Sequence, residues 1–177
     1  MKLLTSFLLA ALALPAVAAD NPYAGQERRA IKALSEQEIS DYMNGRGIGT
    51  SRAAELNHYP GPRHVLDLAQ QIGLSEQQFA KAQALYDTMA SDAARLGKRI
   101  VQKEAELEAL YASRTADADN TRGVVRELAT LQAEFRLVHL DAHLAMRQVL
   151  SPQQIAAYDR LRGYDGTKPS NEGHRHH

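Results

Sequence analysis

Two long stretches of the chain place hydrophobic residues at alternating steps of three and four, which is the spacing of a helix with one apolar face. In the first stretch, from Glu76 to about Arg114, these residues are Leu85, Met89, Ala93, Leu96, Ile100, Leu107 and Leu110. In the second, from about Thr121 to Leu150, they are Val124, Leu128, Leu131, Phe135, Val138, Ala142, Ala145 and Val149. Only the short polar segment 115–120 separates the stretches, so the pattern predicts an antiparallel hairpin of two long helices.

Three helices are predicted to begin at copies of one short phrase. It reads Leu-Ser-Glu-Gln-Gln-Phe at residues 74–79, Leu-Ser-Pro-Gln-Gln-Ile at 150–155 and, more weakly, Leu-Ser-Glu-Gln-Glu-Ile at 34–39. The serine caps the helix by accepting a backbone hydrogen bond, Gln or Glu three residues later completes a capping box, and the leucine packs onto the first turn. The predicted capping residues of the two stronger copies are Leu74, Ser75, Gln78, Leu150, Ser151 and Gln154.

Short helices are predicted around the hairpin. Their extents are from Ser35 to about Asn44, from Thr50 or Ser51 through Asn57, from Pro62 to Ile72, and from Pro152 to Arg162. Gly73 and Gly163 follow two of them as natural stops. The segment 45–49 reads Gly-Arg-Gly-Ile-Gly, like a phosphate-binding loop, but no strand precedes it, so a turn is predicted there.

No segment has the pattern of a β-strand, so the predicted fold class is all-α. A hairpin of two helices cannot bury both of its faces by itself. The short helices, or a second copy of the chain, must therefore cover it. We expect a homodimer.

The first 19 residues have the pattern of a secretory leader. Lys2 precedes an apolar run from Leu3 to Leu14, which is too short to span a bilayer, and small residues follow it. We expect cleavage after about Ala18 or Ala19 and export of the rest of the chain. The predicted divisions are the leader at 1–19, short helices and turns at 20–61, the hairpin domain at 62–163, and a disordered histidine-containing tail at 164–177.

The amino-acid composition limits the kinds of site and partner that the protein can have. The chain has no cysteine, which excludes disulfides, thiolate metal sites and a cysteine nucleophile. Its 21 basic and 21 acidic residues balance, so nothing favours nucleic acid or an anionic membrane as a partner. It has no tryptophan and only 3 phenylalanines, which argues against an aromatic-rich ligand pocket.

Histidines supply the candidate metal ligands. His139 and His143 stand four residues apart on the second long helix, and Met146 follows on the same face. The pattern predicts that they lie beside the apolar face, partly exposed, where paired imidazoles chelate Ni²⁺, Cu²⁺ or Zn²⁺ and methionine favours copper. The alternative is two solvated histidines beside an antiparallel core. His58 and His64 flank a Tyr-Pro-Gly-Pro turn, and a folded-back N-terminal region would add them to the set.

Three further histidines, His174, His176 and His177, give the end of the sequence a metal-binding composition. A solubilising end is the alternative. Histidines on a mobile segment bind metal weakly, because ordering them costs conformational entropy.

The sequence predicts no enzyme. Segment 139–143, His-Leu-Asp-Ala-His, superficially resembles a zinc protease helix. That motif needs Glu directly after its first histidine as the general base, and Leu140 takes that place. No nucleophile is paired with a base by order or spacing.

An exported helical chain with two Leu-Ser-x-x-Gln phrases resembles the Spy/CpxP superfamily, the periplasmic LTxxQ-motif proteins, over roughly Pro62 to Arg162. Relatives in that superfamily include the zinc-binding ZraP proteins and the CnrX-type nickel and cobalt sensors. Residues 146–160 are particularly similar to the sensor branch. The resemblance implies a curved, hairpin-based homodimer in the periplasm.

The resemblance implies three kinds of function. Spy-like members are ATP-independent chaperones that hold clients on the concave face. CpxP-like members modulate a sensor kinase. CnrX-like members bind metal through His, Glu and Met and signal to a membrane partner.

The resemblance also implies ligands. Met146 matches the sensors' methionine ligand, while the histidine expected one turn earlier falls on Ala142, with His143 adjacent. His64 lies close to a sensor histidine on the preceding helix. The expected acidic ligand meets Ala or Gln at 82–83, so the alternative is a rearranged site that uses both histidines of the long helix.

These observations predict a non-catalytic periplasmic stress protein that binds divalent Ni, Co, Cu or Zn in sensing or resistance, without an organic cofactor. The alternative is an ATP-independent holdase chaperone or a modulator of an envelope-stress sensor kinase. The expected partners are a second copy of the chain and either a membrane sensor protein or unfolded periplasmic clients, and not nucleic acid.

Overall fold

The computed structural model describes residues 22–166. The predicted leader and the histidines at 174, 176 and 177 lie outside this range. Within it, every regular element is a helix, as predicted for an all-α protein. The elements are the 3-10 helix η1 (Gln26–Arg28) and the α-helices α1 (Glu36–Met43), α2 (Arg52–Glu55), α3 (Pro62–Asp67), α4 (Glu76–Ala112), α5 (Ala118–Val149) and α6 (Pro152–Arg162).

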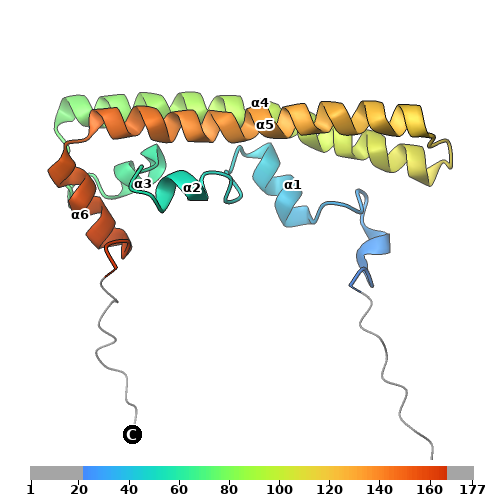
Figure 1. Cartoon of the computed structure of the whole chain (residues 1–177), viewed down its shortest axis with the longest axis horizontal. Coiled ribbons are helices and arrows are strands. Elements are labelled where there is room, and N and C mark those ends of the chain that lie inside the picture. The colour runs from blue at the N-terminus through green and yellow to red at the C-terminus, as the bar shows by residue number, and fades with distance from the viewer. Residues whose placement is uncertain (1–21, 167–177) are drawn as a thin grey trace, which may run out of the picture.

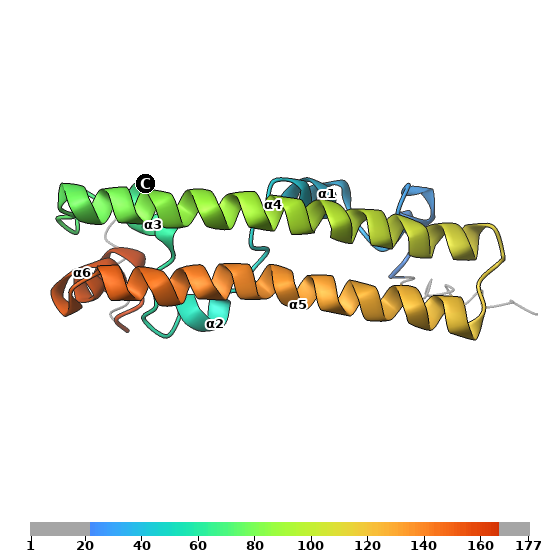
Figure 2. The same cartoon turned by 90° about the horizontal axis from the view of Figure 1, so that it is seen from above.

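The two long helices, α4 and α5, form the predicted hairpin. They run antiparallel along their whole length, joined by a short connection (Figure 1). The short helices α1, α2 and α3 lie along one face of the hairpin, and α6 turns towards the same side from the end of α5. The opposite face of the hairpin is free of other helices in the view from above (Figure 2).

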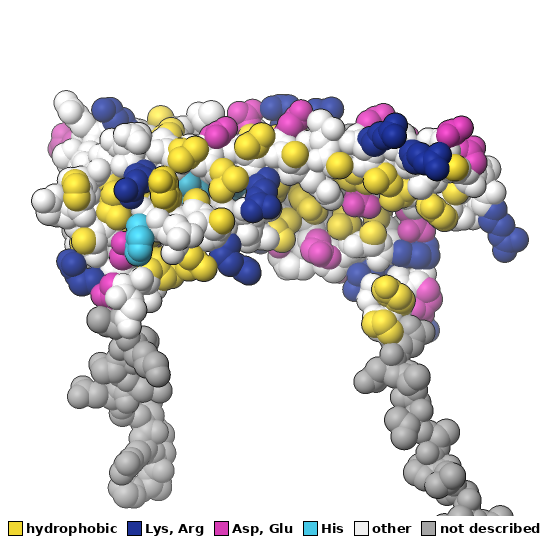
Figure 3. Space-filling view, in the orientation of Figure 1, with side chains coloured by type: hydrophobic (Ala, Val, Ile, Leu, Met, Phe, Trp, Pro, Cys, Tyr) yellow, Lys and Arg dark blue, Asp and Glu magenta, His cyan; other side chains and the backbone are white. Residues whose placement is uncertain are grey.

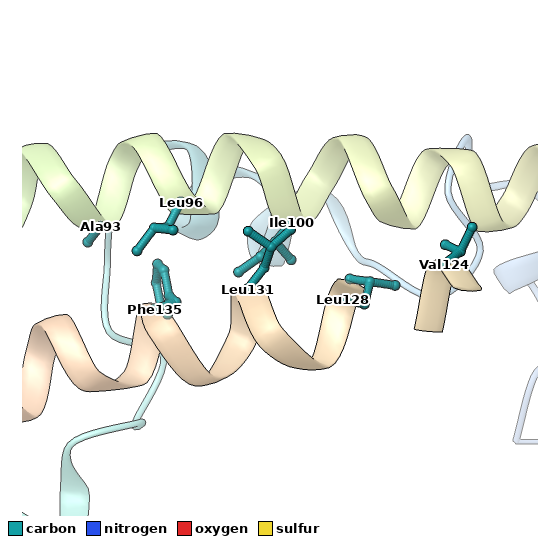
Figure 4. Close-up of a cluster of buried hydrophobic side chains, with 7 residues drawn as sticks. All are labelled: Ala93, Leu96, Ile100, Val124, Leu128, Leu131 and Phe135. Carbon is teal, nitrogen blue, oxygen red and sulfur yellow. The ribbon is translucent and has the colours of Figure 1, made fainter. Parts of the chain in front are cut away.

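The middle of the hairpin has an apolar core from the predicted positions of both helices. Its buried members are Ala93, Leu96, Ile100, Val124, Leu128, Leu131 and Phe135. Leu96 points towards Phe135, and Ile100 lies against Leu131, as Figure 4 shows. The predicted antiparallel pairing of the two long helices is therefore confirmed. The Tyr42 ring of α1 packs edge-on against Phe135 at 5.3 Å.

Helix α1 approaches α4 closely because glycine is present on both sides of the contact. A Cβ on Gly97 would overlap the carbonyl oxygen of Tyr42. A Cβ on Gly45 would lie 2.7 Å from the Ala94 nitrogen and 2.8 Å from the Ala90 oxygen. Nothing in the sequence pattern marks Gly97, which stands inside a long helix where glycine is otherwise unfavourable.

A second core lies where α3 and α6 meet the end of the hairpin. Its buried members are Val65, Ile72, Ala82, Met146, Leu150 and Tyr158. Helix α3 stops at Asp67, earlier than predicted, because Ala69 and Gly73 donate to carbonyls only three residues back and tighten the chain into turns. Helix α2 also ends earlier, at Glu55, and has no side-chain cap from Ser51. Helix α6 has the predicted bounds, and Gly163 ends it in the left-handed region.

Candidate functional site

The candidate ligands meet under the end of the hairpin, at the turn that connects α2 to α3. This turn holds residues 58–61 and contacts both α5 and α6. On the face of the molecule shown in Figure 3, the histidine side chains of the described residues reach the surface only near this end.

His139 is buried, with 4% of its surface exposed, and the prediction that it is partly exposed is wrong. Its Nδ1 lies 2.9 Å from the Phe135 carbonyl oxygen and its Nε2 lies 3.2 Å from the Gly45 carbonyl oxygen. The segment after α1 therefore covers a second face of α5, in addition to the face that meets α4. With both ring nitrogens against carbonyls, His139 has no free nitrogen for a metal ion.

His143 is also buried, at 6% exposed, contrary to the prediction. Its Nδ1 lies 2.6 Å from the Tyr59 carbonyl oxygen, which can only accept, so Nδ1 carries the proton and Nε2 has the lone pair. Burial lowers the pKa of His143, and the nearby His139 and His64 act in the same direction; the Tyr59 carbonyl and Glu55, 3.8 Å away, oppose them. The ring is therefore neutral at neutral pH, which is the form that binds metal.

Met146 is fully buried in the second core, beside Val65 and Tyr158. The prediction placed it with the histidines on the flank of the hairpin contact, and its complete burial there was not predicted. The reason is similar to that for His139 and His143: a short segment, here α3, packs onto the face of α5 that the two-helix pattern leaves open. In this structure the thioether is part of the core.

His58 and His64 are the accessible histidines of the set. The His58 side chain is 54% exposed, and its Nδ1 lies 2.8 Å from Oδ2 of Asp159 on α6. Its carbonyl accepts a hydrogen bond from Arg147 at 2.8 Å. The His64 side chain is 41% exposed, with Nδ1 3.7 Å from Oδ2 of Asp67.

Three histidines thus surround one turn with a common arrangement. His58, His64 and His143 each direct Nδ1 towards an oxygen atom, and no described residue bonds their Nε2 atoms. Such an outer partner is the usual arrangement for a metal-binding histidine, because it fixes the ring and its tautomer. Among residues 22–166, however, no group of three or more His, Cys, Asp or Glu residues is assembled for a metal ion.

Glu55, which the sequence analysis did not single out, joins three elements at this end. It accepts hydrogen bonds from the Tyr158 hydroxyl and, at 3.2 Å, from the Gly61 backbone. Arg162 lies 3.6 Å away. Burial and Glu55 together raise the pKa of Tyr158, so its hydroxyl stays protonated. The tyrosine follows Glu55 by 103 residues, and no local pattern predicts the pair.

The two predicted capping phrases contact each other. Ser75 and Ser151 each accept from the backbone three residues on, and Gln78 and Gln154 complete the capping boxes. The Gln78 and Gln154 amides also bond each other, and they reach the Val149 and Gly73 carbonyls. Leu150 is buried in the second core and Leu74 packs against it. The repeated phrase therefore joins the starts of α4 and α6.

Two hollows flank this end of the hairpin. One is a polar pocket of about 970 Å³ between the α1–α2 loop, α3 and α5, and it is lined by His64, His139 and His143 among others. The other is an apolar groove of about 610 Å³ lined by α4 and α5 alone. Its main apolar side chains are Leu85, Met89, Val138 and Val149.

Comparison with known proteins supplies the family. The model of a family described as heavy-metal resistance matches residues 47–157, more than half of the chain. The chain has no significant match among curated proteins or among solved structures. Within the described residues, no helix is both long and apolar enough to cross a membrane. The matched segment includes the turn with its histidines, the hairpin and most of α6, and the chain belongs to the heavy-metal resistance family, a non-enzymatic family of the Spy/CpxP-like superfamily.

Proposed function

We propose that this protein is exported to the periplasm and binds a divalent transition metal ion through the histidines around the 58–61 turn. One observation carries the proposal: His58, His64 and His143 each have Nδ1 against an oxygen atom, and their Nε2 atoms have no partner among residues 22–166. Membership of the heavy-metal resistance family supports it. The activity is binding, in sensing or resistance, and not catalysis.

Each histidine contributes differently. His143 is held neutral by burial, so little proton competition opposes binding at its Nε2. His58 and His64 are half-exposed and can rotate. Because no metal-binding group is assembled in residues 22–166, such rotation is needed to bring their nitrogen atoms to one metal ion. Imidazole nitrogen suits Ni²⁺, Co²⁺, Cu²⁺ and Zn²⁺, and the bound ion would supply the link between these side chains.

Calorimetric titration tests the proposal. The protein starts at residue 20, and His174, His176 and His177 are changed to Asn so that only the folded region can bind. His58→Gln and His64→Gln should each weaken binding of Ni²⁺ or Zn²⁺ at least tenfold. His139→Gln is the matched control, because both nitrogens of His139 already contact carbonyls, and the affinity should stay within about twofold. Unchanged affinity in a His58/His64 double variant would refute the site.

The apolar groove favours a second candidate function, that of an ATP-independent holdase. It is lined by residues of α4 and α5 alone, and no residue of a short helix lines it. An unfolded client segment would bury its apolar side chains there. Met89→Gln should then reduce suppression of client aggregation, while Tyr111→Ser, at the far end of α4, should not. Homodimer formation, a membrane sensor partner and modulation of a sensor kinase remain predictions from the resemblance.

A further inference from the structure

The polar pocket carries more positive than negative charge. Its lining holds four arginines and two carboxylates, namely Arg46, Arg52, Arg63, Arg162, Glu55 and Asp67. These side chains give the pocket an excess of two positive charges. Such an excess favours an anion in the part of the pocket that the arginines line.

Two of the four arginine side chains have partners in the described range and two do not. Arg46 pairs with Asp41 at 2.9 Å, and Arg162 lies 3.6 Å from Glu55. The side chains of Arg52 and Arg63 form no ion pair or hydrogen bond with any residue of the described range. The Arg52 guanidinium folds back onto the loop before it, since a Cβ on Gly49 would lie 3.1 Å from its Nη2.

The loop that lines the pocket also has backbone donors without an acceptor in the described range. The N–H groups of Gly47, Ile48, Gly49 and Ser51 donate to no acceptor in residues 22–166. Gly45 and Gly49 have φ of 64° and 74°, and Ile48, a β-branched residue, has φ of 47°. Successive N–H groups of a turn that contains left-handed residues can form a concavity that binds anions. A β-branched residue in this region is strained, and such strain gathers at functional sites.

We infer that this pocket binds a tetrahedral oxyanion such as phosphate, held by the loop N–H groups together with Arg52 and Arg63. Guanidinium groups match the geometry of oxyanions, and the loop amides add neutral donors. The inference goes beyond the proposed metal binding, since its ligand has the opposite charge. A pocket of about 970 Å³ accommodates either the free ion or the phosphate group of a small molecule.

Titration of the full chain with phosphate tests the inference. EDTA is present, so that success or failure is independent of metal binding, and sodium chloride at equal ionic strength is the reference. Arg52→Gln and Arg63→Gln should each raise the Kd for phosphate at least tenfold. Arg126→Gln, an exposed arginine on the far half of α5, is the control and should change it less than twofold. Equal loss in all three variants would mean non-specific attraction and would overturn the inference.

Amide NMR locates the ion. Phosphate should shift the resonances of residues 47, 48, 49 and 51 more than those of α4. Shifts confined to other segments, or no binding above the chloride reference, would overturn the inference. Glycerol phosphate provides the second arm: tighter binding than phosphate identifies a phosphorylated small molecule as the source, and equal or weaker binding identifies the free ion. With either ligand, the amide resonances of residues 47, 48, 49 and 51 should shift.

Discussion

The middle and the α6 end of the hairpin are stabilised in different ways. In the middle, α1 closes an apolar core that includes Ile100 and Phe135, and the contact is close because Gly97 lacks a side chain. At the end, α5, α6 and the segment from α2 to the 58–61 turn are joined partly through polar groups, of which His143 is buried and Glu55 is mostly buried. Polar contacts cost stability wherever a partner is missing. The comparison indicates that the middle serves as scaffold and that the end holds the candidate chemistry.

Loss of the largest side chain in the middle should have the largest effect. Phe135→Ala should lower the free energy of unfolding by about 3–5 kcal/mol, because it leaves a cavity between α4, α5 and Tyr42. Urea unfolding followed by circular dichroism measures it. Leu137→Ala, two residues away and half-exposed, should change stability by less than about 0.5 kcal/mol. Similar losses in both variants would contradict the assigned core.

Replacing each of two glycines inside the long helices by alanine should change the stability of the protein in opposite directions. Gly97→Ala should destabilise the protein by about 1–3 kcal/mol, because its Cβ overlaps the Tyr42 carbonyl and displaces α1. Gly123→Ala, in α5 with nothing within 4 Å of its Cβ, should stabilise it by about 0.5–1 kcal/mol through helix propensity. Chemical denaturation of both variants measures these changes in stability. A stabilising Gly97→Ala would show that α1 does not pack as described.

The sequence predicted the hairpin because its pattern is local and long. The apolar steps located α4 and α5 to within a few residues and placed Phe135 in their contact. The same pattern failed for His139 and His143, since it assumes that α5 has one contact face. The segment that covers the second face, between residues 45 and 67, has no helical period of its own. Its contacts with α5 and α6 span 84 to 103 residues of sequence, and no spacing rule reaches that far.

The buried His143 makes this end of the hairpin sensitive to acid. Burial lowers the pKa of His143 below its usual value of about 6.5, so the unfolded chain takes up a proton that the folded protein excludes. Stability from this residue is therefore complete above about pH 6.5 and is lost as pH falls towards the lowered pKa. Denaturation at several pH values should show this slope, with Glu55, His64 and His139 as the titratable neighbours.

A His143→Gln variant should lose that part of the pH slope while it keeps the remainder. Gln retains a polar group of similar length but cannot take up a proton in this range. An identical pH profile in the two proteins would mean that another group produces the acid sensitivity.

The prediction with the smallest expected effect on stability concerns the contact between the two capping phrases. Ser75→Ala and Ser151→Ala should each cost about 0.5–2 kcal/mol, since each removes an N-cap acceptor. Caps far apart would give additive losses, but the amides of Gln78 and Gln154 bond each other and connect the two helix starts. Residues of one hydrogen-bond network couple by about 0.5 kcal/mol or more. The double variant should therefore depart from the sum of the single losses by at least that amount.

Ser35→Ala provides the reference for this coupling. Ser35 caps α1 with a capping box of the same kind, but its network does not include Gln78 or Gln154. Combined with Ser75→Ala, it should give additive losses, because the two caps share no hydrogen-bond partner. Denaturation of the three single serine variants and of the two double variants measures both cycles. Coupling of equal size in both would mean that the loss spreads through the whole fold, and additive losses in both would mean that the Gln78–Gln154 contact contributes nothing to the end of the hairpin.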